Sequence, residues 1–323
     1  MGKIASADPS CTLTFMPRPV RAFPPPARPS GYHPLLKGTG FAVQDCVCHL
    51  GRTSPAAENV FKAHRVAVLL AGTFHYQSDV GQTLLGPGSM LLGRSGRGYC
   101  YRHVDDGGDR TVTFDFSDEL LEDTRRSLGI PSIDRADFRV PSIPASRQTA
   151  ATTALTLRAL RLNDPELWEE AVLLVATTAV LRSAQLTAPA KVTRPANDSE
   201  RRAIARALRH IETNHHQDCS LRSLADGTGM SIFRFLRLFK TLTSQTPRQY
   251  LLATRLHAAV SRLIETPDRI LEIAYDVGFG DISHFNQIFV ATFGLPPRQF
   301  RRLARLVPGL SYWTFAESFR LDE

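Results

Sequence analysis

The spacing of apolar residues divides the chain into a strand-rich part and a helical part. From about Phe41 to Phe116, short apolar runs such as VAVLL (66–70) and TVTFDF (111–116) alternate with glycine-containing turns. Short strands at regular spacing predict an all-β sandwich or barrel. After Phe116 the apolar residues recur every three to four positions, which predicts helices. We therefore expect a two-domain α+β chain, with an all-β N-terminal domain that carries following helices and an all-α C-terminal domain.

Three helices are predicted directly after the β region. The first lies between Ser117 and Gly129, because serine caps helices and glycine ends them. The second is expected around Ala150–Leu162 and the third over Pro165–Leu186. The third carries one continuous apolar stripe, made of Trp168, Val172, Val175, Ala176 and Ala179. Two uses of this stripe are open: packing onto the β domain, or a contact in a dimer.

The most informative pattern lies in residues 270–301. A short apolar helix ends at Gly278, and Asp281 can cap the helix that follows. The second helix buries its phenylalanines and leaves a polar face outward, made of Ser283, His284, Asn286 and Gln287. Two short helices around a glycine turn, the second with hydrogen-bonding side chains outward, are typical of a helix-turn-helix.

A second helix-turn-helix is predicted upstream of this one. Gly229 makes its turn and Ser231 caps its second helix, whose outward side chains are Phe233, Leu236, Arg237 and Lys240. A helix over 247–264 joins the two units and is about 27 Å long at ~1.5 Å per residue. Since neighbouring major-groove faces lie ~34 Å apart, such a connector suits two helices that read adjacent grooves.

These motifs carry a family resemblance. Residues 273–301 fit IAxxVGFxDxSHFxxxFxxxFGxxPxxFR, where x is any residue, and this string closely resembles the signature of AraC/XylS-family transcription regulators. Val290 stands where the family usually has lysine, Phe300 where it has tyrosine, and Ser244 where it has glycine. The resemblance implies a DNA-binding domain with two helix-turn-helix units over residues 200–305.

The β region resembles the same family more locally. GQTLLGPGSMLLG at 81–93 is similar to the central turn of the cupin-like sensor domain that many family members carry. This implies a cupin-like barrel or sandwich over residues 31–186 that binds an effector and forms a dimer. The usual metal-binding cupin motif is absent, so no cofactor is expected.

Chemistry and position in the family pattern assign roles to the exposed side chains. The residues predicted to contact DNA are Phe233, Leu236, Arg237, Lys240, Ser283, His284, Asn286, Gln287, Arg298 and Arg301. Arg237 can donate two hydrogen bonds to guanine, while Asn286 and Gln287 can pair with adenine. The side chains expected to contact phosphates are Lys240, Arg298 and Arg301. For Arg298 and Arg301, plain solvation near a helix end is the alternative.

Composition agrees with a polyanionic partner. The chain of 323 residues has a net charge of +8, and residues 198–307 hold 16 Lys and Arg against 10 Asp and Glu. No apolar run approaches a membrane span and no signal peptide is evident, so we expect a cytoplasmic protein with no membrane partner. The five cysteines fit no disulfide framework, which agrees with a reducing compartment.

Cysteine and histidine recur in the β region and leave two interpretations open. Cys46, Cys48, Cys100 and His103 are candidates for a soft-metal site or a redox pair. The alternative is core packing, because free cysteine behaves as a compact apolar residue. Strand alternation puts Cys46 and Cys48 on one face, as core residues would be.

Two segments lack apolar periodicity. Residues 1–30 are proline-rich and are predicted to form a disordered arm, with an over-early start codon as the alternative. Residues 187–199 are predicted to be the interdomain linker.

The sequence as a whole predicts a sequence-specific transcription regulator of the AraC type that binds operator DNA and responds to a small effector. Activation and repression of transcription are both left open. A homodimer is expected, and RNA polymerase is a further candidate partner. The alternative from another class is a cupin-type metal-dependent enzyme with a DNA-binding appendage. No G-x-S-x-G elbow, H-E-x-x-H helix or phosphate-binding glycine loop occurs in the chain, so we do not expect an enzyme.

Overall fold

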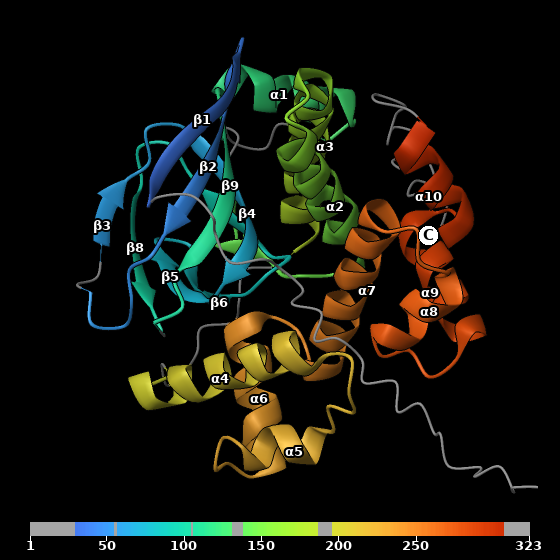
Figure 1. Ribbon diagram of the computed structural model, residues 1–323. Helices are drawn as coiled ribbons and strands as arrows, with labels where there is room; N and C mark the ends of the chain where they lie inside the picture. The colour runs from blue at the N-terminus through green and yellow to red at the C-terminus, as the bar shows by residue number, and fades with distance from the viewer. Residues whose placement is uncertain (1–29, 55–56, 105, 131–137, 187–195, 307–323) are drawn as a thin grey trace, which may run out of the picture.

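The computed structural model describes residues 30–54, 57–104, 106–130, 138–186 and 196–306 (Figure 1). Nearly all of the predicted arm at 1–30 and most of the predicted linker at 187–199 lie outside these residues.

The N-terminal part is a sandwich of two antiparallel sheets, as the short apolar runs predicted. One sheet has the order β1 (Gly31–Gly38), β2 (Phe41–Cys48), β9 (Asp109–Phe116), β4 (His64–Gly72), β7 (Met90–Gly93) and β10 (Ser142–Ile143). The other has the order β3 (Ala57–Val60), β8 (Gly98–His103), β5 (Phe74–Ser78) and β6 (Gly81–Leu85). The all-β architecture predicted for the N-terminal part is therefore confirmed.

Strand β1 begins ten residues before the predicted start of the strands at Phe41. Its sequence, GYHPLLKG, contains a proline, and the pairing of β1 with β2 shifts register between Pro34 and Leu36. Because an edge strand tolerates a proline and a bulge, β1 pairs well without a regular apolar alternation.

Strand β4 shows how alternation builds two layers of core. Val66 and Val68 pack on the helical side of the larger sheet, whereas Ala67 and Leu69 pack between the two sheets. Three helices cover that helical side: α1 (Asp118–Ser127), α2 (Arg147–Leu162) and α3 (Pro165–Gln185) (Figure 1). All members of the apolar stripe of α3 are buried, and the Trp168 ring lies 6.4 Å from that of Phe114 in β9. Of the two uses left open for this stripe, the structure therefore has it packed against the sandwich.

The C-terminal part is all helical. It consists of α4 (Asp198–Asn214), α5 (Leu221–Asp226), α6 (Ile232–Thr243), α7 (Pro247–Glu265), α8 (Ile270–Asp276), α9 (Ile282–Phe293) and α10 (Pro297–Leu306). Helix α4 starts at Asp198, two residues before the expected start of the DNA-binding domain at residue 200. The Asn197 side chain accepts from the Glu200 amide at 2.8 Å, and the Glu200 carboxylate accepts from the Asn197 amide at 2.9 Å. This capping box pairs two backbone amides at the helix start. The helix therefore begins directly after Asn197, ahead of its first apolar residue.

The helical part lies directly against the sandwich. One apolar cluster runs from the larger sheet through α2 into α7 and α9, and includes Leu256 and Val260 of α7. Close to the start of α7, Thr83 of β6 donates a hydrogen bond to the carbonyl of Leu242, in the last turn of α6, at 3.2 Å. The two parts therefore share an apolar core at this junction, because α7 and α9 bury apolar faces against α2. Among these residues, no helix combines the length and apolar character that crossing a membrane requires.

Candidate DNA-binding surface

Helix α6 is the predicted recognition helix of the first unit. The Ser231 hydroxyl accepts from the Arg234 amide at 3.4 Å and caps the helix. Phe235 and Phe239 are fully buried, and their rings meet edge to face at 5.7 Å. These two anchors turn the opposite side of the helix outward. There Phe233 is 86% exposed. Arg237 and Lys240 are exposed and Leu236 is half-buried.

Helix α9 plays the same part in the second unit. The Asp281 carboxylate accepts from the amides of His284 at 2.9 Å and Ser283 at 3.1 Å. These two bonds lower the pKa of Asp281, so the cap stays charged at neutral pH. Phe285, Phe289 and Phe293 are fully buried. The predicted readers all face outward: Ser283, His284, Asn286 and Gln287 are exposed.

Helix α7 joins the two units (Figure 1), and side-chain hydrogen bonds and ion pairs hold it near both ends. Near its start, the Tyr250 hydroxyl donates to the Glu212 carboxylate of α4 at 2.7 Å. Near its end, Arg262 donates to Asp268 at 2.6 Å and to Asp276 of α8 at 2.7 Å. Because Arg262 is only 14% exposed, these ion pairs are partly shielded from solvent. The connector therefore holds the two recognition helices at a set spacing.

Arg255, in the middle of α7, ties the first unit to the turn of the second. Its guanidinium donates to the carbonyls of His215 at 2.7 Å and Gln217 at 2.9 Å. The turn at Gly278 of the second unit packs against the same His215 carbonyl, since a Cβ added to Gly278 would lie 2.5 Å from its oxygen. Sequence patterns did not single out Arg255, because its partners are backbone carbonyls far away in the chain.

The predicted phosphate contacts differ in their surroundings. Arg298 is exposed and lies with Asn286 and Gln287 along a groove between α8, α9 and α10. Arg301 is half-buried and lies near Asp268, whose pKa is lowered mainly by the Arg262 hydrogen bond and further by the charge of Arg301. The structure thus brings Arg298, but not Arg301, alongside the predicted base readers.

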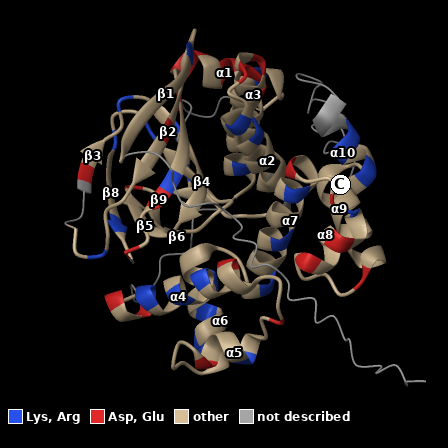
Figure 2. Ribbon diagram, in the orientation of Figure 1, with Lys and Arg blue, Asp and Glu red and all other residues tan. Residues whose placement is uncertain are grey.

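A further basic patch lies on α4, as Figure 2 shows, and sequence analysis did not single it out. Arg202, Arg206 and Arg209 line a cavity of about 250 Å³ together with Arg52 and Asp106 of the sandwich. The four-residue spacing of Arg202 and Arg206 was the available signal, because it puts both on one helix face.

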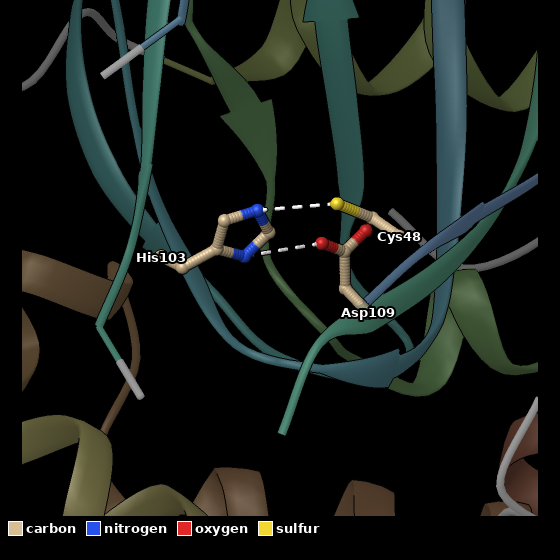
Figure 3. Close-up of side chains that lie close together, drawn as sticks. All are labelled: Cys48, His103 and Asp109. Carbon is tan, nitrogen blue, oxygen red and sulfur yellow. Dashed lines mark hydrogen bonds and ion pairs between the residues drawn. The ribbon is translucent and has the colours of Figure 1, made fainter. Parts of the chain in front are cut away.

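The cysteine and histidine candidates are only partly brought together. The Cys48 thiol lies 3.3 Å from Nε2 of His103, and Nδ1 of His103 lies 3.4 Å from the carboxylate of Asp109 (Figure 3). Cys46 lies on the same face of β2, but Thr111 and Tyr32 hydrogen-bond its thiol, and burial raises the pKa of Cys46 to about 11. Asp109 was missed, because only the pairing of β2 with β9 puts it opposite Cys48.

Cys100 is placed away from this cluster. It alternates along β8 with Tyr99 and Tyr101, whose rings pack between the two sheets. Its side chain therefore points to the other face of the strand, away from His103. The proposed set of Cys46, Cys48, Cys100 and His103 is thus replaced by Cys48, His103 and Asp109, which are the residues with converging ligand atoms.

Comparison with known proteins agrees with the helical geometry. A family model described as a helix-turn-helix domain matches residues 224–303, which include both recognition helices. The HTH-type transcriptional activator RhaS of Pectobacterium atrosepticum is 32% identical over 108 residues, 33% of this chain and 39% of that protein. The transcriptional activator NphR of a Rhodococcus species is 35% identical over 100 residues, 31% of this chain and 30% of that protein. This chain carries an AraC-type helix-turn-helix domain.

The family-model match, at residues 224–303, lies in the helical part of the chain and not in the sandwich. The chain spans less than two-fifths of the length of these curated relatives. Among solved structures, an AraC-type DNA-binding domain protein from Chromobacterium violaceum is 27% identical, covering 34% of this chain and 98% of that one, with a TM-score of 0.32. ToxT from Vibrio cholerae is 11% identical, covering 81% of this chain and 98% of that one, with a TM-score of 0.30. Both TM-scores are below 0.5, so the family assignment rests on the sequence matches.

Proposed function

We propose that this protein is a sequence-specific DNA-binding transcription regulator whose AraC-type domain reads two adjacent major grooves. The observation that carries the proposal is the pair of outward faces on α6 and α9, held apart by an α7 that is bonded at both ends. A helix in the major groove reads base edges with side chains such as Arg237, Asn286 and Gln287. The exposed Lys240 and Arg298 are proposed to hold the phosphate backbone.

The relatives support the direction of regulation and the partners. RhaS and NphR are named as transcriptional activators, so we propose that this chain activates transcription and has RNA polymerase as its second macromolecular partner. The sandwich is the proposed site of a small effector and of homodimer formation, in a cytoplasmic protein. An enzymatic role has less support, because the relatives matched are regulators.

The test is selection of bound sites from a random DNA pool by the full chain, followed by footprinting. We expect one preferred sequence with two protected patches for each bound protomer, on the same face of the duplex and about one helical turn apart. The double variant Arg237→Ala/Gln287→Ala is the control, since both side chains are exposed and their loss leaves the fold intact. Binding without any sequence preference would overturn the proposal.

A further inference from the structure

Three chemically distinct side chains meet where strands of the two sheets end. Cys48 is the last residue of β2, Asp109 is the first of β9, and the two are paired across the larger sheet. His103 is the last residue of β8 in the smaller sheet. Figure 3 shows the imidazole of His103 facing both the thiol and the carboxylate. The cluster therefore bridges the two sheets.

We propose that Cys48, His103 and Asp109 bind a borderline-soft divalent cation of the zinc class. A thiolate, an imidazole and a carboxylate are the ligand types that zinc takes in proteins. With bonds of about 2.0–2.3 Å, two ligands of one tetrahedral zinc lie roughly 3.3–3.8 Å apart. The Cys48 sulfur lies 3.3 Å from Nε2 of His103, which is within that range. The Asp109 carboxylate lies 3.4 Å from the other ring nitrogen, Nδ1, and one ligand atom from each of the three residues lies within 4.8 Å of the others. Three protein ligands leave the fourth position open.

Burial supports a metal at this place. The side chains of His103 and Asp109 are only 5% and 8% exposed. Removing a carboxylate and an imidazole from water costs free energy, and coordination of a cation offsets that cost. On binding, the Cys48 thiol becomes a thiolate bonded to the metal and its proton is released to solvent.

The redox interpretation lacks a suitable second thiol among the described residues. The Cys46 thiol is engaged by Thr111 and Tyr32, and Cys100 points to the other face of β8. All four cysteines in the described part of the chain are free. The arrangement around Cys48 thus favours coordination over a disulfide.

The site also lies next to the AraC-type domain. His103 and Asp109 are the two ends of the β8–β9 loop, and Val104 of this loop packs in the same apolar cluster as Ile204 and Leu208 of α4. A cation bound by His103 and Asp109 would link the two ends of that loop. Resting on the proposed function, we therefore expect the cation to change the affinity of the protein for its operator.

The binding test uses the full chain, reduced and stripped with a chelator, titrated with Zn²⁺ in a weak buffer without DNA. We expect one equivalent to bind with release of about one proton, and Co²⁺ in its place to show a thiolate charge-transfer band. Cys48→Ser should abolish that band. Asp109→Asn should weaken zinc binding by at least about tenfold, because losing even a residue that only supports a ligand costs about 10–100-fold. Cys46→Ser and Cys100→Ser are matched controls that should bind as the wild type does.

Two results would overturn the site: no stoichiometric zinc binding, or binding that survives Cys48→Ser. Mass spectrometry of the unmodified chain tests it without any variant, because zinc should protect Cys48 from alkylation while Cys100 stays reactive. The operator affinity is then measured with and without Zn²⁺. An unchanged affinity with zinc bound would overturn the coupling to α4, and failure to bind DNA at all would overturn the proposed function instead.

Discussion

The two helix-turn-helix units hold their recognition helices with the same devices but expose different side chains. Their caps, Ser231 and Asp281, stand fifty positions apart, and the buried phenylalanines follow at the same offset. The exposed positions differ: Phe233, Leu236, Arg237 and Lys240 in α6 stand where Ser283, Asn286, Gln287 and Val290 stand in α9. A shared framework that sets helix orientation can therefore carry two unlike surfaces, and the surfaces decide what each unit reads.

The turns before the two recognition helices should respond most differently to substitution. Gly278 and Gly229 both have positive φ, at 97° and 69°. A Cβ on Gly278 would collide with the His215 carbonyl, whereas a Cβ on Gly229 would meet nothing within 4 Å. We expect Gly278→Ala to lower the free energy of unfolding by ~3 kcal/mol and Gly229→Ala by ~1 kcal/mol. Both substitutions place a side chain on left-handed backbone, and only Gly278→Ala also produces a steric clash.

Urea denaturation of the full chain, followed by circular dichroism, measures the two losses side by side. Equal losses would mean that the second unit is not packed against Arg255 and the end of α4 as described.

The base contacts should separate the two units on DNA. Arg237→Ala is expected to cost ~1–3 kcal/mol and relax preference at one base pair, and Gln287→Ala to do the same about one helical turn away. Binding assays with wild-type and point-substituted operators locate each loss. If both variants relaxed the same cluster of bases, the two units would not read separate grooves.

The C-terminal caps of the two recognition helices offer a reciprocal exchange. Ser244 ends α6 in the left-handed region at φ 60°, and Gly294 ends α9 at φ 70°. Because only glycine adopts this conformation without strain, Ser244→Gly should raise the free energy of unfolding by up to ~1 kcal/mol and Gly294→Ser should lower it by ~1 kcal/mol. Thermal denaturation of both variants tests the pair, and shifts of the same sign would contradict it.

The smallest expected effect concerns one phosphate contact. Lys240 and Val290 occupy equivalent exposed positions, and only the first carries a charge. Lys240→Ala should reduce the salt dependence of binding by about one unit without changing base preference, and Val290→Lys should increase it by about one unit. The slope of log K against log salt measures both, and a change of base preference in either variant would reassign that position to base reading.

Local patterns in the chain were sufficient to predict the helical framework. Ser231 and Asp281 correctly placed the starts of α6 and α9, and Gly278 correctly marked the end of α8. This worked because caps and turns depend on contacts within a few residues. The outward faces of α6 and α9 followed from the same repeat, since burying one side of a helix leaves the other exposed.

The contacts between distant segments were decided by the tertiary structure alone. No local pattern shows that α7 packs on α2, that Arg255 binds carbonyls at the end of α4, or that strand pairing sets Asp109 opposite Cys48. Strand alternation predicted that Cys46 and Cys48 share a face, but which thiol meets His103 depends on how the two sheets are stacked. The framework of the AraC-type domain could thus be predicted from local sequence. The cation cluster and the domain contacts required the fold, because Cys48 lies 55 positions from His103 and Arg255 lies 40 positions from His215.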